Sequence, residues 1–127
     1  MKTSSSLTAL VVALGIAFSV SSFAQKDPNF TPPGSEELAA VDRANAEIDA
    51  VYAQLRKKLE PEESKSLQEA QRAWIKWRDA EADLIARLGG GIGHGSAFRV
   101  DFANAQTKLI KERTEVLKKY LAEAGSR

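Results

Sequence analysis

Apolar residues recur at intervals of three and four along three long segments of the chain, which is the spacing of amphipathic helices. In residues 35–59 they form one stripe, interrupted only by Asn45: Leu38, Val41, Ile48, Tyr52, Leu55 and Leu59. A single Asn on such a stripe more often fixes helix pairing than carries chemistry. Ser35 is suited to cap this helix, with Glu36 and Glu37 in the first turn, where the helix dipole favours acids.

The second segment, residues 61–88, lies between two boundary residues. Pro61 suits the first position of a helix, and Gly89 suits the position after its end. Its expected core stripe consists of Leu67, Ala70, Trp74, Trp77, Leu84 and Leu88, flanked by Ala73, Ile75 and Ile85. The tryptophans could instead anchor a binding surface, but their place on this stripe favours the core. Arg78 lies at the edge of the stripe, where we expect a salt bridge to a neighbouring helix.

A glycine-rich segment precedes the third helix. Five of the seven residues 89–95 are glycine, a density that a helix does not tolerate. Ser96 can cap the helix that follows, and Gly125 can end it. Its apolar stripe consists of Phe98, Phe102, Ala105, Leu109, Val116 and Tyr120, with Ile110, Leu117 and Leu121 beside it. Since no segment alternates with period two, we predict an all-α fold: an antiparallel three-helix bundle with a Gly-rich loop between its second and third helices.

The residues before the first helix indicate export. Lys2 precedes an uncharged apolar run from Leu7 to Val20, and Ser22-Phe23-Ala24 has the small-x-small pattern of a cleavage site. We therefore predict that residues 1–24 are a secretory signal peptide, cleaved after Ala24. The apolar run is shorter than the about 20 residues that span a bilayer, so a retained membrane anchor is the less favoured alternative.

After cleavage, residues 25–34 would form an extended leader and residues 35–127 the helical domain. This mature protein would be periplasmic or secreted, without an integral membrane segment. The chain has no cysteine, so packing alone must stabilise it. Its formal net charge of +1 falls to about zero without Lys2, whereas a nucleic-acid-binding protein would be basic. We therefore expect no nucleic-acid partner.

Candidate chemistry is sparse in this sequence. The single histidine, His94, lacks the further ligands that a metal site requires, and its nearness to Ser96 does not make a catalytic pair. We therefore predict no enzyme activity, no metal and no cofactor. The glycine loop has two interpretations: a helix connector, or a protrusion that enters a partner's cleft. In the second interpretation Gly91, Ile92, His94 and Ser96 would contact a protein partner.

One segment carries a specific resemblance to a known family. The sequence AQRAWIKWRDAE at residues 70–81 resembles the central signature of the lysozyme inhibitor LprI-like family. Residues 48–52 and 109–117 resemble two weaker family segments, on the first and last helices. The signature residues that we expect to be structural are Tyr52, Gln71, Trp74, Arg78, Asp79 and Arg113. The family usually has two cysteines where Ala82 and Ala105 stand, so this chain would lack the disulfide between them.

The resemblance implies an exported protein that inhibits a lysozyme or another peptidoglycan-degrading enzyme. It therefore implies a protein partner with an open substrate cleft. Two alternatives remain. One is an immunity protein against a rival's toxin, which would plug a similar cleft. The other is an envelope structural or assembly protein whose helical surface pairs with another exported protein, and an exposed apolar patch would favour it.

Overall fold

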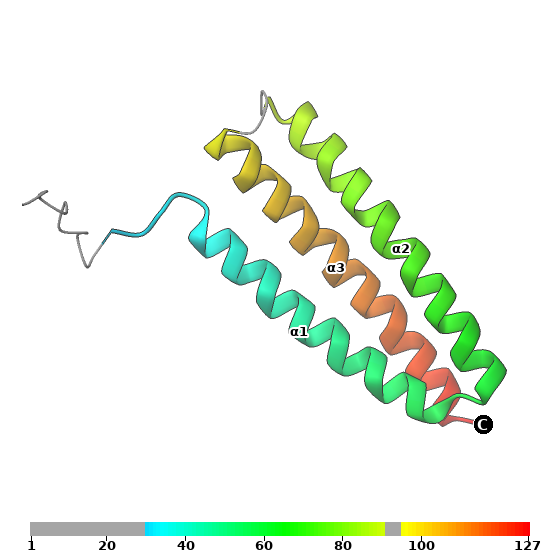
Figure 1. Cartoon of the computed structure of the whole chain (residues 1–127). Helices are drawn as coiled ribbons and strands as arrows, with labels where there is room; N and C mark the ends of the chain where they lie inside the picture. Colours follow the sequence, from blue (N-terminus) through cyan, green and yellow to red (C-terminus); the bar gives the residue numbers. More distant parts are fainter. Residues whose placement is uncertain (1–29, 91–94) are drawn as a thin grey trace, which may run out of the picture. The chain divides into compact units, whose positions relative to one another are not determined.

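The computed structural model describes residues 30–90 and 95–127, which form three long helices with no strand among them (Figure 1). Helix α1 spans Ser35–Lys58, α2 spans Pro61–Leu88 and α3 spans Ser96–Gly125. Helix α2 runs antiparallel to α1 and α3, and α3 lies between the other two in the view of Figure 1. The predicted all-α class is therefore confirmed.

The ends of α2 follow the boundary residues in the sequence. Pro61 is the first helical residue, and Glu60 before it forms a reciprocal capping box with Glu63. In that box the backbone N–H of Glu60 donates to Oε2 of Glu63 at 3.1 Å. Gly89 is the C-cap, as predicted. Both ends of α2 are thus set by local chemistry that the sequence already displays.

Two predicted helix caps are wrong. Ser35 is the first residue of α1, and Gly34, with a φ of 87°, is the N-cap. The Ser35 hydroxyl instead donates to the carbonyl of Pro32 at 2.8 Å. Ser96 is likewise the first residue of α3, after Gly95 as N-cap. In both places the chain turns into the helix through a glycine, which leaves the serine one position too late to cap.

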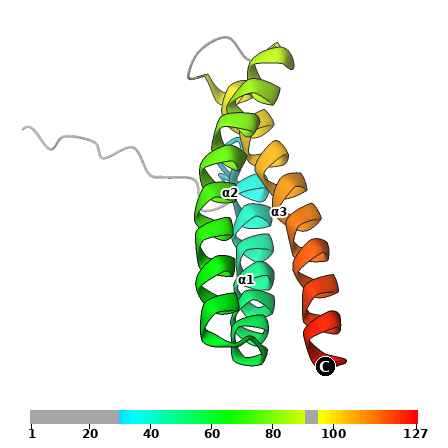
Figure 2. The same ribbon diagram turned by 90° about the vertical axis from the view of Figure 1, so that its right-hand side faces the viewer.

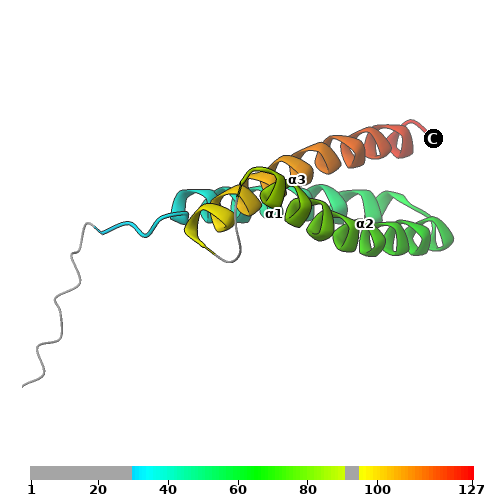
Figure 3. The same ribbon diagram turned by 90° about the horizontal axis from the view of Figure 1, so that it is seen from above.

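Helix α3 packs closely against both other helices, whereas α1 and α2 approach each other at few points. Figures 2 and 3 show the C-terminal end of α3 diverging from α1 and α2. The larger core cluster joins all three helices: Ala44, Ile48, Val51, Leu55, Leu67, Ile110 and Leu117. A smaller cluster joins α2 and α3: Ala82, Ala105 and Leu109. Helix α3 therefore buries two faces, while each neighbour buries mainly one.

The buried face of α2 differs from the predicted stripe. Trp77, Leu84 and Leu88 were expected in the core, but they are 52%, 49% and 78% exposed. The face turned to α3 instead carries Ala82 and Ala86, both fully buried. Small side chains let two helix backbones approach closely, so this part of α2 needs no large apolar residue in its interface.

Smaller corrections apply to α1 and α3. On α1 the buried face contains Ala44, while Asn45 beside it is only half-buried, and Leu38 at the start of the expected stripe is 58% exposed. On α3, Tyr120 was expected in the core and is 45% exposed. Both large side chains lie toward the ends of their helices, where fewer neighbours are available to cover them.

Candidate functional site

The predicted partner-binding loop lies mostly outside the described residues. This holds for Gly91, Ile92 and His94, so the structure does not place their side chains. Ser96, the fourth residue of this group, is exposed on the first turn of α3. The assignment of partner binding to the loop therefore stays a prediction.

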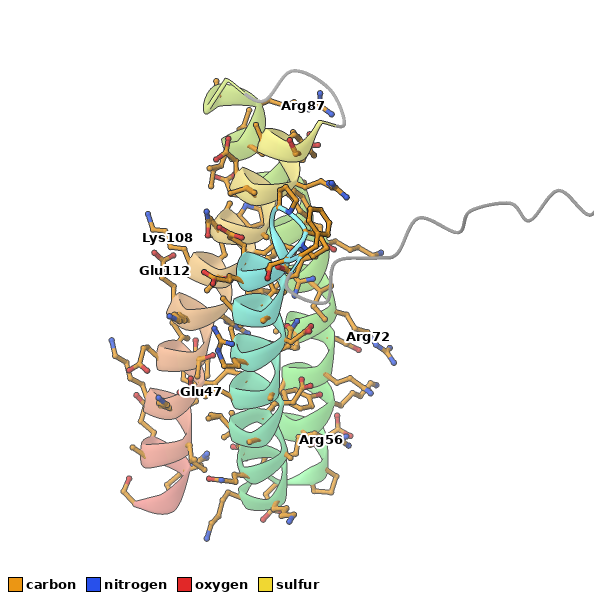
Figure 4. All side chains as sticks on the ribbon, turned by 90° about the vertical axis from the view of Figure 1, so that its left-hand side faces the viewer. Glu47, Arg56, Arg72, Arg87, Lys108 and Glu112 are labelled. Carbon is orange, nitrogen blue, oxygen red and sulfur yellow. The ribbon has the colours of Figure 1, made fainter. Side chains whose placement is uncertain are left out.

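A contact between the end of α2 and the start of α3 joins the two helix ends that flank this loop. Arg87, which Figure 4 shows at the loop end of the helices, forms a two-point ion pair with Asp83, with N–O distances of 2.7 and 3.1 Å. Its Cζ lies 5.5 Å from the ring centroid of Phe98, which links the end of α2 to the start of α3. The contact with Asp83 raises the pKa of Arg87, so this guanidinium stays charged.

Two glycines shape the start of the loop. Gly90 has a φ of 91°, a left-handed conformation that favours glycine. A Cβ on Gly89 would lie 3.2 Å from Oδ2 of Asp101, which shows how closely the end of α2 approaches α3. At Gly90 the chain after α2 thus takes a backbone conformation that favours glycine, and Gly89 before it lies close to Asp101 of α3.

The family signature residues meet between α2 and α3. The Nε of Arg113 donates to Oε1 of Gln71 at 3.1 Å. The Cζ of Arg113 also lies 5.9 Å from the ring centroid of Trp74, and the Cζ of Arg78 lies 5.4 Å from it. Two guanidinium groups, one from each helix, therefore contact one half-buried indole.

Asp79 extends this network to a further turn of α3. Its Oδ1 lies 2.7 Å from a terminal nitrogen of Arg78 and accepts a hydrogen bond from Nε2 of Gln106 at 3.1 Å. The predicted salt bridge of Arg78 to a neighbouring helix is wrong, because Arg78 pairs with the next residue of its own helix. Asp79 and Gln106 supply the link between helices at this level.

Tyr52, the remaining signature residue, lies on α1 and packs against the larger core cluster. The Cζ of Arg56 lies 5.9 Å from its ring centroid. The structure thus brings Gln71, Trp74, Arg78, Asp79 and Arg113 together. Tyr52 lines a small groove with Gln71. These contacts support the prediction that the signature residues hold the helices in position.

A groove that the sequence did not reveal lies at the opposite end of the helices from the loop. It has a volume of about 540 Å³ and is formed where the end of α1, the start of α2 and the end of α3 meet. Its apolar lining residues are Leu55, Leu59, Leu67, Ala70 and Tyr120. At its charged edge Arg127 donates to Glu63 at 2.6 Å, which lowers the pKa of that carboxyl. The groove has the size of a small-ligand site.

The outward face of α2 carries the most exposed apolar surface on that helix. We call the following residues the outer stripe, all of them exposed: Ala70, Ala73, Trp77, Ala80, Leu84 and Leu88. Their spacing alternates between three and four residues up to Leu84, so they lie along one line on the helix. Trp77 is 52% exposed in this stripe, and tryptophan is a residue type enriched in binding surfaces.

Among residues 30–90 and 95–127 there is no group of three or more His, Cys, Asp or Glu side chains that could hold a metal ion. None of the helices in that part of the chain combines the length and apolarity of a membrane span. Fold and surface together define a class: a small all-helical protein with exposed apolar residues along one helix.

The family follows from comparison with known proteins. The profile of a family described as lysozyme inhibitor LprI matches residues 37–117, which is more than half of the chain. The chain therefore belongs to the lysozyme inhibitor LprI family. The matched span runs from the first turn of α1 well into α3 and includes the glycine loop and every signature residue. No curated protein and no solved structure matches the chain.

Proposed function

We propose that this chain is an exported binding protein that inhibits a lysozyme or a related peptidoglycan-degrading enzyme and has no catalytic activity of its own. The observation that carries the proposal is the family match over residues 37–117. Export is supported by the basic start, the apolar run and the small-x-small site within residues 1–24.

Inhibition by this protein would consist of blocking a substrate cleft. Enzymes that cleave glycosidic bonds use two carboxyl groups on either side of the scissile bond, and access to that cleft is what an inhibitor must prevent. The glycine loop is our candidate for the inserted element, with Ile92, His94 and Ser96 as its contacts. The paired base of Arg87 and Phe98 supports this choice, because a fixed base lowers the entropy lost when a loop is bound.

A cell-wall turbidity assay tests this function directly. The full chain, processed by the cell that expresses it, is titrated into an animal-type lysozyme acting on bacterial walls. We expect loss of lysis at near-stoichiometric ratios. Unimpaired lysis at a large molar excess would reject animal-type lysozyme as the target.

The loop assignment needs its own variant. The double change His94→Ala and Ser96→Ala should weaken inhibition at least tenfold while leaving the melting temperature unchanged. Ser66→Ala, an exposed serine at the distant groove, is the matched control and should inhibit normally. Full inhibition by the loop variant would show that the contact surface lies outside the loop. Weakened inhibition by Ser66→Ala would indicate that it lies at the groove.

A further inference from the structure

The outer stripe of α2 has the pattern of a helix-pairing seam. Ala70, Ala73, Trp77, Ala80 and Leu84 occupy five successive positions of a heptad repeat, and Leu88 follows one position beyond the next. At 1.5 Å per residue the stripe is about 27 Å long. From Ala70 to Leu84 no charged residue interrupts it, and Arg87 holds the next heptad position. A helix face that contacts only water is expected to carry polar residues, and the stripe from Ala70 to Leu84 carries none.

The order of large and small residues along the stripe is self-complementary. Reversed about a point near Asp79, Leu88 comes opposite Ala70, Leu84 opposite Ala73, and Trp77 opposite Ala80. Every large side chain would therefore meet an alanine. In a parallel pairing each large side chain would meet its own copy and each alanine an alanine, which leaves two large side chains facing each other at three levels and gaps at three others.

We propose that this face binds a second copy of the chain, with the two α2 helices antiparallel around a twofold axis near Asp79. An isologous interface requires a surface that is complementary to itself, and the alternation of large and small residues supplies this property. This pairing of α2 helices does not depend on a lysozyme target, so its test is independent of the test of inhibition.

Flanking charges fit the same arrangement. Lys76 and Asp83 lie on one side of the stripe at equivalent heptad positions, one heptad apart. Around the same axis, Lys76 of each copy comes opposite Asp83 of the other. Asp83 also forms an ion pair with Arg87 of its own helix. Opposite charges at these flanking positions set the orientation of paired helices.

The oligomeric state of the full chain is the first test, measured by light scattering coupled to size-exclusion chromatography over a range of concentrations. We expect twice the monomer mass at high concentration. Ala80→Glu places a carboxylate at the centre of the seam and should return the mass to that of a monomer. Ala53→Glu makes the same change on the exposed side of α1 and should stay dimeric. A monomeric parent chain, or a dimer that survives Ala80→Glu, overturns the proposal.

Cysteine variants test the orientation, since the chain has no cysteine of its own. Around the proposed axis two copies of residue 80 are offset along the helix by about 3 Å, and two copies of residue 73 by about 18 Å. A disulfide needs Cα atoms within about 7 Å. We therefore expect oxidation to cross-link Ala80→Cys dimers but not Ala73→Cys dimers. Equal cross-linking of both variants would show a parallel pair and overturn the antiparallel arrangement.

Discussion

A disulfide introduced between positions 82 and 105 tests the packing of α2 on α3 most directly. The two alanines are 0% and 5% exposed and belong to one buried cluster with Leu109. They are also the positions where the resemblance places the family cysteines. We expect the double variant Ala82→Cys/Ala105→Cys to form an intramolecular disulfide on oxidation.

The size of the effect follows from the loop that the bridge closes. A loop of about 24 residues corresponds to about 3.4 kcal/mol at 25 °C in the chain-entropy relation, less any strain in the bridge. For a domain of this size that stability corresponds to an upper limit of about 14–27 °C in melting temperature. Before oxidation the double variant should be less stable than the parent, because each added sulfur atom enters a filled interface and costs about 1–3 kcal/mol.

Thermal unfolding followed by circular dichroism, with and without reductant, measures this difference. Ala82→Cys/Ala122→Cys is the control, because Ala122 is exposed more than four turns further along α3 and cannot reach α2 at that level. A folded double variant that forms no bridge at positions 82 and 105 would refute the pairing of these helices. A bridged form that melts below its reduced form would refute it equally.

Three further perturbations test other parts of the fold. Trp74→Ala should lower the unfolding free energy measured in urea titrations by about 3 kcal/mol, because it removes core packing and two guanidinium contacts. Trp77→Ala should lower it by less than about 1 kcal/mol at low protein concentration, since Trp77 is half exposed. Thr107→Val should raise stability by about 1 kcal/mol, since the buried Oγ1 of Thr107 has no hydrogen-bond partner in the described part of the chain. Lys118 donates to Glu47 at 2.8 Å and lowers the pKa of that carboxyl. This contact stabilises the fold at a pH above the pKa that Glu47 has in the unfolded chain. The stabilisation is lost as the pH falls through the lower pKa that Glu47 has in the folded chain, so the melting curves of the parent and Lys118→Met should converge below pH 4.5.

The sequence predicted helix number, class and most boundaries because these depend on local chemistry. Pro61, Gly89 and Gly125 each mark an end that the structure confirms. The caps at Ser35 and Ser96 failed because a serine caps only from the position before the helix, and both serines follow a glycine that already occupies it. Such one-residue differences depend on backbone conformation, which composition does not specify.

The buried face of α2 could not be predicted for a different reason. This helix has two apolar stripes, one with large residues such as Trp77 and Leu84 and one with the small residues Ala82 and Ala86. Hydrophobicity alone favours the larger residues. The structure buries the alanines, because α3 approaches closely there and large side chains would hold it away. The stripe that stays exposed is the basis of the proposed pairing, and it can be seen only after the core has been assigned.

The two proposed surfaces are compatible in one molecule. Around an antiparallel α2 pair, the Gly89 positions of the two copies, where each glycine loop begins, would lie about 30 Å apart along the helices. Each loop base would then face away from the twofold axis, and neither would block the other's approach to a target. Pairing through the outer stripe would therefore leave one inhibitory loop per chain available. Since changes in the stripe and in the loop act on separate equilibria, Ala80→Glu should leave inhibition per chain intact, and the loop variant should leave the dimer intact.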